Sequence, residues 1–276
     1  MAEGGFRSEL KPVWCEGCGD YAALDALAKG LEAMKPRPQD VVLVAGIGCG
    51  SRLPGYLNSF RLHTVHGRAL PAALGAKVAN PALTVIAVGG DGDGLAIGGN
   101  HFLHTLKRNP HMLYMMTDNG VYGMTRGQAS PTADPGLKTR STPYGSIEPS
   151  VDPAALAITV GATFVARGFS GNPRQLRQIV LEGLRHKGFA FVQVLSPCVT
   201  FHNTYPELKE TAKEIPATHD RMDRIAALQI AWSETPYTGV LYSIERPTLQ
   251  EQLDTVATQA KKAGPDTIEG LLEEFA

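Results

Sequence analysis

The sequence predicts a three-layer α/β fold, in which helices cover both faces of a parallel β-sheet. Short apolar runs alternate along the chain with segments of helical pattern, and this alternation is typical of parallel sheets. The runs are apolar throughout, which indicates strands that are buried on both faces. Each run ends in glycine or a polar turn. Ligands of such folds bind at the carboxyl ends of the strands, so we expect the functional site there.

Five runs are predicted to be strands because they are short, rich in β-branched and aromatic residues, and followed by turn residues. The predicted strands are residues 41–46, 84–90, 112–120, 163–168 and 189–197. The segments around them are predicted to be helices, at residues 21–34, 71–79, 96–107, 153–160 and 173–187. A loop rich in Pro, Ser, Thr and Gly occupies residues 127–153, and long loops in compact domains are often functional.

The chain changes character after Pro206, where charged residues become more frequent and the pattern is mostly helical. One more strand is predicted within residues 238–247, and a short capped helix within residues 264–275. We therefore predict a main domain, residues 1–205, and a C-terminal tail, residues 206–276, that packs on this domain or on a partner subunit.

The composition is that of an ordinary globular protein: 43% of the 276 residues are hydrophobic, 19% are charged, and the net charge is −1. This balance favours neither nucleic acid nor a membrane surface as a partner. The N-terminus lacks the order of a signal peptide, and no apolar run reaches the roughly 18 residues that span a bilayer. We expect a cytoplasmic protein, whose cysteines serve as thiols, ligands or catalytic groups rather than disulfides.

A glycine-rich turn, GGDGDG, closes the strand at residues 84–90 and lets the backbone approach an anionic ligand. It is no dinucleotide fingerprint, because Leu95 stands where the third glycine is required, and no P-loop sequence follows. Its two carboxylates, Asp91 and Asp93, can face a phosphate only through a cation. Mg²⁺ combines protein oxygens with phosphate oxygens in this way.

A second polar turn, TDNGVYG, ends the strand at residues 112–120, and its Asn119 lies 28 residues after Asp91. If the two strands are neighbours in a parallel sheet, both turns open on the same edge and can grip one metal-bound diphosphate. The alternative is that both are ordinary turns, in which Asp, Asn and Gly are the usual residues. The spaced pair favours the cofactor site.

The four cysteines form one pair, Cys15 and Cys18, and two single positions, Cys49 and Cys198. No convincing strand precedes Cys15, as a thioredoxin-type site requires, and the single cysteines supply no second zinc knuckle. The distribution suits a [4Fe–4S] cluster, whose ligands need only converge in space. Cys49 and Cys198 each follow a predicted strand, so we expect them beside the diphosphate site. Alternatively, these two are buried small residues.

The G-D-G turn and the downstream Asn together resemble the thiamine pyrophosphate motif. By this resemblance the Mg²⁺ ligands are the side chains of Asp91 and Asn119 and the carbonyl of Val121, and the residues along the diphosphate are Gly90, Gly92 and Asp93. Many members of that family have Asn-Asn at the second turn. In this chain Asp118 replaces the first Asn, and Asn119 keeps the second. The residue that the resemblance assigns as a Mg²⁺ ligand is therefore retained.

Six blocks of the chain resemble, in order, the β subunit of the 2-oxoacid:ferredoxin oxidoreductases, the family of the pyruvate and 2-oxoglutarate enzymes. They are WCEGCGDYAAL, GIGCGSR, HTVHGRALPAALGAKVANP, GGDGDGLAIGGNH, DNGVYGMTRGQASPT and SPCVTFHNTY. The resemblance implies a thiamine-diphosphate-binding fold of the PP type, with the four cysteines on one [4Fe–4S] cluster. The implied cofactor-binding residues are Ile47, Gly48, Cys49, Ser51, His66, Gly90, Asp91, Gly92, Asp93, Asn119, Val121, Tyr122 and Gly123.

The same resemblance implies coenzyme A-dependent oxidative decarboxylation of a 2-oxo acid, with 2-oxoglutarate favoured and pyruvate next. Electrons would pass through the cluster to ferredoxin, and the reaction could also run as reductive carboxylation. The chain shows a single diphosphate half, so we expect a separate α subunit with the pyrimidine-binding domain and an (αβ)₂ assembly. Trp14 and Tyr21 are expected to pack beside the cluster.

Two residues are candidates for catalytic roles. Arg52, three residues after Cys49, suits bidentate binding of a distal carboxylate such as that of 2-oxoglutarate; an ordinary salt bridge is the alternative. His66 either contacts the cofactor or caps a helix, and the resemblance favours the first.

Two other functions compete with this interpretation. A non-redox thiamine-dependent decarboxylase or synthase would share the diphosphate site but would not need four converging cysteines. A non-catalytic iron–sulfur or zinc module would use the cysteines but would not need the diphosphate site.

Overall fold

The computed structural model describes residues 5–263 and 267–275, and these residues form an eight-stranded sheet with the strand order β2-β1-β3-β4-β8-β7-β10-β9. Neighbouring strands are parallel except β10, which runs antiparallel to β7. The predicted α/β fold is therefore confirmed. The strands are β1 (Val41–Ala45), β2 (Phe60–His63), β3 (Thr84–Gly90), β4 (Met112–Asp118), β7 (Phe164–Phe169), β8 (Phe189–Leu195), β9 (Lys213–Glu214) and β10 (Tyr237–Ser243).

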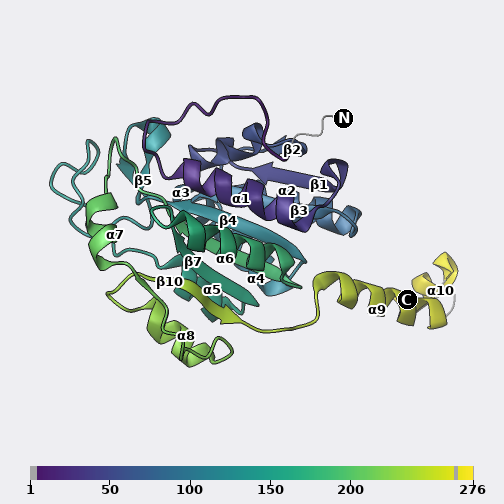
Figure 1. The fold of residues 1–276 in the computed structure, drawn as a ribbon. Helices are drawn as coiled ribbons and strands as arrows, with labels where there is room; N and C mark the ends of the chain where they lie inside the picture. The colour runs from purple at the N-terminus through teal and green to yellow at the C-terminus, as the bar shows by residue number, and fades with distance from the viewer. Residues whose placement is uncertain (1–4, 264–266, 276) are drawn as a thin grey trace.

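Helices cover both faces of this sheet and make three layers (Figure 1). On one face lie α1 (Asp20–Met34) and α6 (Pro173–Arg185), whose leucines pack on the central strands. On the other face lie α2 (Ala69–Ala79), α4 (Gly99–Arg108), α5 (Pro153–Val160) and α8 (Arg224–Ala231). There Phe102 and Phe191 stack edge to face at 5.0 Å between ring centroids. The sheet is thus buried on both sides, as its apolar strands predict.

The helix predicted at residues 96–107 starts later than expected, as α4, and a short helix α3 (Asp91–Leu95) precedes it. The chain breaks between the two helices at residues 96–98. A Cβ at position 98 would clash with the carbonyl oxygen of Asp93, so the chain turns there in a way that only glycine permits. The break lets Asp91 and Asp93 lie in the first turn after β3.

The segment predicted as a tail, residues 206–276, contributes both to the body and to a part that leaves it. Its β10 joins the main sheet, while α9 (Leu249–Ala263) and α10 (Ile268–Glu274) extend away from the body (Figure 1). The short capped helix predicted within residues 264–275 is α10: Thr267 caps it by accepting a hydrogen bond from the Gly270 amide at 3.1 Å, and residues 264–266 lie outside the described part. A further helix, α7 (Tyr205–Thr211), follows the loop after β8.

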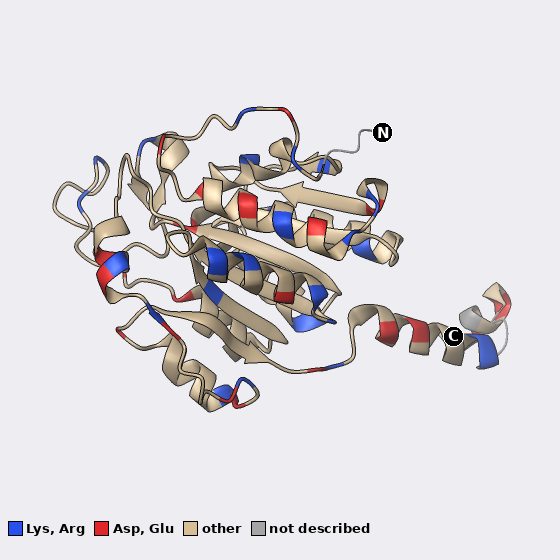
Figure 2. Cartoon of the chain, viewed as in Figure 1, with Lys and Arg blue, Asp and Glu red and all other residues tan. Residues whose placement is uncertain are grey.

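The long loop at residues 127–153 contains β6 (Gln128–Ala129), which pairs with β5 (Val121–Tyr122). Short 3₁₀ turns occur at Pro38–Asp40, Gly50–Tyr56 and Gly123–Thr125. Positive and negative side chains are interspersed along α1 and over the rest of the face shown in Figure 2. None of the described helices combines the length and the apolar character that crossing a membrane requires.

Candidate active site

A cavity of about 200 Å³ opens at the carboxyl ends of β1, β3 and β4, which are adjacent parallel strands. This is the edge at which the sequence predicts the site. Every predicted cofactor-binding residue except Ser51 lines it. The lining residues among those predicted are Ile47, Gly48, Cys49, His66, Gly90, Asp91, Gly92, Asp93, Asn119, Val121, Tyr122 and Gly123.

Two buried carboxylates, Asp91 and Asp118, lie at the carboxyl ends of the neighbouring strands β3 and β4, and Asp91 lines the cavity. The Thr132 hydroxyl oxygen is 2.7 Å from Asp91 Oδ2 and 2.6 Å from Asp118 Oδ1, and Ser130 also donates to Asp91. Burial first, and then the charge of Asp118, raise the pKa of Asp91 to about 7. Burial likewise raises the pKa of Asp118. A pair of buried acids with one shared hydroxyl fits a divalent cation, because such an ion removes the mutual repulsion.

Polar residues inside the sheet orient Asp118. Gln193 Nε2 donates to Asp118 Oδ2 at 2.7 Å, and Arg167 Nε donates to Gln193 Oε1 at 2.8 Å. Arg167 also pairs with Asp152, the N-cap of α5, at 2.9 Å. The sequence prediction missed this chain of contacts. The sequence does contain a signal for these contacts, because Arg167 and Gln193 lie within strands that are otherwise apolar.

The second turn is closed by Asn119, whose Oδ1 accepts a hydrogen bond from the Val121 amide at 3.0 Å. A carboxamide oxygen has two lone pairs, so one remains available for a metal ion. The turn also needs Gly120, which has a φ of 72°. The predicted Mg²⁺ ligands Asp91, Asn119 and Val121 thus line one cavity, and their binding of Mg²⁺ stays a prediction.

Asp93 connects two loops that border the cavity. Its Oδ1 accepts hydrogen bonds from the amides of Ile47 at 2.9 Å and Gly67 at 2.8 Å, and His66 Nδ1 lies 3.0 Å from the same oxygen. One carboxylate therefore ties together the loop after β1 and the loop before α2. It holds Ile47 and His66 against the cavity.

Gly92 is required by close packing with Tyr122. A Cβ at position 92 would clash with Cε1 of the Tyr122 ring. The ring covers the G-D-G turn, and burial, followed by the charge of Asp91, raises the pKa of its hydroxyl. Its ring centroid is 6.1 Å from that of His66. These two side chains therefore shape one wall of the cavity.

The four cysteines come together beside the cavity. A Cβ on Gly123 would lie 3.6 Å from Cys49 Sγ and 3.7 Å from Cys198 Sγ. Burial first, and then Asp20 and the Cys198 and Cys15 thiolates, raise the pKa of Cys49 to about 11. Burial first, and then the negative charges of Asp20, Cys49 and Cys198, raise the pKa of Cys18 above that of Cys49. The structure therefore joins residues that are 149 positions apart in sequence, Cys49 and Cys198.

The four thiols are the ligands that the sequence predicts for a [4Fe–4S] cluster, and their binding of it stays a prediction. In the described residues, no three His, Cys, Asp or Glu side chains converge as ligands of one metal ion. Sulfur ligands of one zinc ion all lie about 2.3 Å from it, whereas each cysteine of a [4Fe–4S] cluster binds a different iron and the sulfurs stay farther apart. The raised pKa values also mean that the thiolate forms need a positive partner.

Aromatic residues support Cys49 from behind. Trp14 Nε1 donates to the Cys49 carbonyl oxygen at 2.8 Å, and the Trp14 ring packs edge to face against Tyr21 and Tyr56. The sequence prediction missed Asp20, which is 1% exposed and accepts a hydrogen bond from Ser196 at 3.0 Å. Burial raises the pKa of Asp20 to about 6.

Arg52 and Ser51 lie away from the cavity. The 3₁₀ turn after Cys49 directs them to a separate hollow of about 380 Å³, which Arg61 and His63 also line. Arg52 is exposed there. The expectation that Arg52 borders the cofactor pocket is therefore not met within this chain, and its catalytic role stays a prediction.

Comparison with known families matches two segments. Residues 42–194 match the thiamine pyrophosphate enzyme, C-terminal TPP binding domain. Residues 198–258 match the family that describes the C-terminal part of the pyruvate ferredoxin oxidoreductase beta subunit. The first match spans the whole cavity, and the second begins at Cys198.

Individual proteins show the same similarity. The chain is 38% identical to 2-oxoglutarate synthase subunit KorB of Methanocaldococcus jannaschii, over 92% of this chain and 96% of that protein. It is also 38% identical to 2-oxoacid:ferredoxin oxidoreductase subunit beta of Saccharolobus solfataricus, over 87% and 84%. A solved structure of 2-oxoglutarate:ferredoxin oxidoreductase from Magnetococcus marinus, with 2-oxoglutarate, coenzyme A and succinyl-CoA bound, has a TM-score of 0.91 and 35% identity, covering 100% of this chain and 97% of that one.

Proposed function

Because the chain belongs to the β subunits of the 2-oxoacid:ferredoxin oxidoreductases, we propose that it carries thiamine diphosphate, Mg²⁺ and one [4Fe–4S] cluster in a 2-oxoglutarate-oxidising enzyme. It is an oxidoreductase subunit of the 2-oxoglutarate synthase type. We propose that the reaction consumes coenzyme A, releases CO₂ and delivers electrons to ferredoxin, and that it can also run as reductive carboxylation.

The position of Cys49 carries this proposal. Cys49 lines the cavity that contains Asp91 and Asn119, and its sulfur lies beside Gly123 together with that of Cys198. A non-redox thiamine enzyme gains nothing from a cysteine group at its cofactor pocket. A zinc or iron–sulfur interaction module gains nothing from the buried acid pair. The arrangement is useful where electrons leave a bound cofactor one at a time.

When bound, thiamine diphosphate supplies the nucleophile for decarboxylation and the cluster supplies a one-electron acceptor. In this chain Asp91, Asn119 and the Val121 carbonyl would hold the Mg²⁺, and Thr132 would donate to Asp118 once Asp91 binds the ion. Asp93 fixes the Ile47 amide and His66 at the pocket wall. Cys15, Cys18, Cys49 and Cys198 would bind the cluster.

The remaining parts of the enzyme lie on a partner. We propose a separate α subunit that carries the pyrimidine-binding domain and closes the cavity, within an (αβ)₂ assembly. The relatives named as subunits support this partner. Arg52, which faces its own hollow with Arg61, is proposed to meet substrate or the α subunit there. Pyruvate is the second candidate substrate, because the family matched at residues 198–258 is that of a pyruvate enzyme.

The test is anaerobic purification of the chain with its α subunit, followed by a visible spectrum, iron, sulfide and zinc analysis, and turnover with a panel of 2-oxo acids. Each assay contains coenzyme A and a low-potential electron acceptor. We expect iron and sulfide near four per β subunit, as one [4Fe–4S] cluster requires, and fastest turnover with 2-oxoglutarate. Zinc without iron, or acceptor reduction that does not depend on added thiamine diphosphate, would overturn the proposal.

A further inference from the structure

The long loop at residues 127–153 is attached to the body by its two ends. None of the residues from 134 to 150 is buried. The backbone hydrogen bonds of this middle part stay within it, such as the one from the Gly136 amide to the Ser146 carbonyl oxygen at 2.7 Å. The contacts at the two ends of the loop therefore decide where it lies.

The first end of the loop is held by the acid pair. Thr132 Oγ1 lies 2.6 Å from Asp118 Oδ1 and 2.7 Å from Asp91 Oδ2, and Ser130 also donates to Asp91. The hydroxyl group of Thr132 has one proton, which can go to only one carboxylate. When Asp91 binds a cation, the contact that remains for Thr132 is the one to Asp118.

The second end of the loop is held by Arg167, which is buried in β7. Arg167 Nη2 pairs with Asp152 Oδ2 at 2.9 Å, and Asp152 is also the N-cap of α5. The two ends of the loop contact each other as well, because the Val151 amide donates to the Pro131 carbonyl oxygen at 2.8 Å. The loop thus leaves the body and returns to it at one place.

Gln193 joins the two ends of the loop into a closed circuit. It lies directly opposite Arg167 in the pairing of β7 with β8, and Asp118 lies two residues beyond its partner on β4. The three side chains therefore project from the same face of the sheet. Arg167 has only donors, so Gln193 turns its oxygen to Arg167 at 2.8 Å and its NH₂ group to Asp118 at 2.7 Å. We call this circuit the polar ring; its members are Asp118, Gln193, Arg167, Asp152, Val151, Pro131 and Thr132.

The core alone gives no reason for the polar side chains of the ring. Gln193 is 3% exposed and Arg167 5% exposed, in strands that are otherwise apolar. Apolar side chains of similar size often stabilise a core as well as a buried ion pair does. They could not donate a hydrogen bond to Asp118. The position of Asp118 is therefore what the polar ring provides.

The position of Asp118 matters because the next residue, Asn119, is a proposed ligand of Mg²⁺. Asn119 Oδ1 accepts a hydrogen bond from the Val121 amide at 3.0 Å, which closes the metal turn. Rotation of the Asp118 side chain would remove the acceptor that Thr132 needs once Asp91 binds the ion. The donor from Gln193 prevents this rotation.

We propose that Gln193 and Arg167 are positioning residues of the cofactor site: through the polar ring they fix Asp118 and hold both ends of the 127–153 loop beside bound Mg²⁺ and thiamine diphosphate. The inference rests on the proposed function, because it takes Asp91 and Asn119 as ligands of the ion. Neither Gln193 nor Arg167 lines the cavity, so both act through Asp118. Substitutions that open the ring should weaken cofactor binding although every ligand is still present.

The first test reverses one hydrogen bond of the ring in the anaerobic complex of the chain with its α subunit. Gln193→Glu keeps an acceptor for Arg167 but places a carboxylate, which cannot donate, against Asp118. It should weaken binding of Mg²⁺ and thiamine diphosphate, measured by calorimetry, about tenfold or more. Addition of Asp118→Asn supplies a carboxamide that donates to the new carboxylate and still accepts from Thr132. This double variant should regain most of the affinity.

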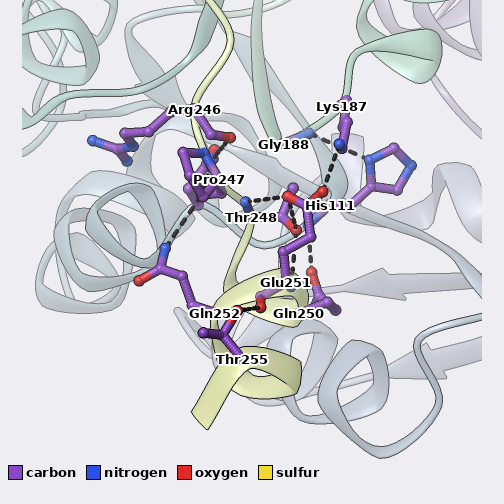
Figure 3. A network of polar contacts seen from close by, with 11 residues as sticks. His111, Lys187, Gly188, Arg246, Pro247, Thr248, Gln250, Glu251, Gln252 and Thr255 are labelled. Carbon is purple, nitrogen blue, oxygen red and sulfur yellow. Dashed lines mark hydrogen bonds and ion pairs between the residues drawn. The ribbon is translucent and has the colours of Figure 1, made fainter. Parts of the chain in front are cut away.

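The matched control is Gln250→Glu, the same substitution in the polar network at the base of α9 (Figure 3). Gln250 Oε1 accepts a hydrogen bond from the His111 amide at 3.1 Å, at the opposite end of β4 from Asp118. The control should bind the cofactor as the unmodified complex does. Thermal unfolding of each complex without cofactor separates loss of affinity from loss of the fold. If Gln193→Glu alone does not fold, the affinity of the double variant decides: normal affinity supports the inference, and lost affinity overturns it.

The second test is hydrogen–deuterium exchange in the same complexes. The Val151 amide should exchange faster in Gln193→Glu than in the unmodified chain, because the end of the loop is released, and the double variant should restore its protection. Unchanged exchange at Val151 in Gln193→Glu overturns the inference. Equal cofactor affinity in the unmodified and Gln193→Glu complexes also overturns it and leaves the proposed function standing. An unmodified complex that binds no thiamine diphosphate overturns both.

Discussion

Asp91 and Asp118 are joined through one hydroxyl group: Thr132 Oγ1 lies 2.7 Å from the first carboxylate and 2.6 Å from the second. That hydroxyl has a single proton, so it can satisfy only one of the two acids at a time. Without a cation, one of them must take up a proton or bear the repulsion, and the raised pKa values of both express this conflict. A divalent ion at Asp91 would free Thr132 for Asp118.

Replacement of Asp91 by Ala should abolish binding of Mg²⁺ and thiamine diphosphate, weakening it by at least about 100-fold, because the ion loses its buried carboxylate. The measurement is cofactor binding by calorimetry in the anaerobic complex. The visible absorption of the cluster should remain, because the cysteines are on other loops. Asp40→Ala, in the 3₁₀ turn before β1, is the control. Normal binding in the Asp91 variant would show that the G-D-G turn does not hold the metal.

Replacement of Cys198 by Ser should remove most of the iron and the visible absorption and stop reduction of ferredoxin. Thiamine diphosphate should still bind, because Cys198 does not line the cavity. Iron content and cofactor binding are measured on the same sample. Asn203→Ala, at an exposed position five residues later, controls for damage to the loop. Full iron content in the Cys198 variant would exclude it as a ligand.

Replacement of Gly123 by Ala should lower the iron content while the chain still folds. The added methyl group would meet Cys49 and Cys198 sulfurs at ordinary contact distance, 3.6 and 3.7 Å, but it would occupy the space between them that a cluster needs. Gly75→Ala in α2 is the matched control, since its Cβ would meet nothing within 4 Å. Thermal unfolding checks the fold and iron analysis checks the cluster. Equal iron in both variants would contradict the placement of the cluster beside Gly123.

Stability should fall in mild acid because of His186. Burial first, and then His111, lower the pKa of His186 to about 4 from an ordinary value of 6.5. Between these values the unfolded chain binds one proton more than the folded chain, so the free energy of unfolding decreases as the pH falls from about 6.5 to about 4, by at most about 1.4 kcal/mol per pH unit. Urea unfolding at several pH values measures this.

The matched variant for this effect is His186→Gln, which keeps a donor toward Thr163, 2.9 Å from Nε2 in the structure. Thr163 donates its own proton to Asn109, so the imidazole is the donor in this contact. The pH slope of the variant should be shallower by the His186 contribution. An identical slope in both proteins would mean that other groups cause the acid sensitivity.

Most of the sheet is predictable from sequence, and the exceptions share a physical cause. The strands of the buried centre, such as Thr84–Gly90, are continuous apolar runs and carry a strong signal. The edge strand Phe60–His63 is exposed along its whole length, so its side chains show no burial pattern. Helix α9 is missed for a related reason, because its residues from 251 to 262 are all exposed and show no burial pattern.

The site is predictable where one residue type dictates the chemistry. Asp91, Asn119 and the cysteines are recognised because carboxylates, carboxamides and thiols at strand ends have few structural uses. Thr132 could not be recognised, because a hydroxyl is common everywhere and gains its meaning only from the neighbour it contacts. Arg52 follows Cys49 by three residues, but its side chain lines a different hollow, because proximity in sequence does not fix the direction of a side chain.

The four cysteines differ in what they face. Cys49 lines the cavity, whereas Cys15 is exposed and accepts a hydrogen bond from Thr200 at 3.2 Å. The proposed cluster, bound between them, would have one side at the cofactor cavity and another side near the solvent. Electrons that reach it from the cavity would leave on the solvent side without crossing the hydrophobic core. The same geometry would expose the proposed cluster to dioxygen at Cys15. The position of Cys15 would therefore determine both where a redox partner docks and how quickly the cluster is lost in air.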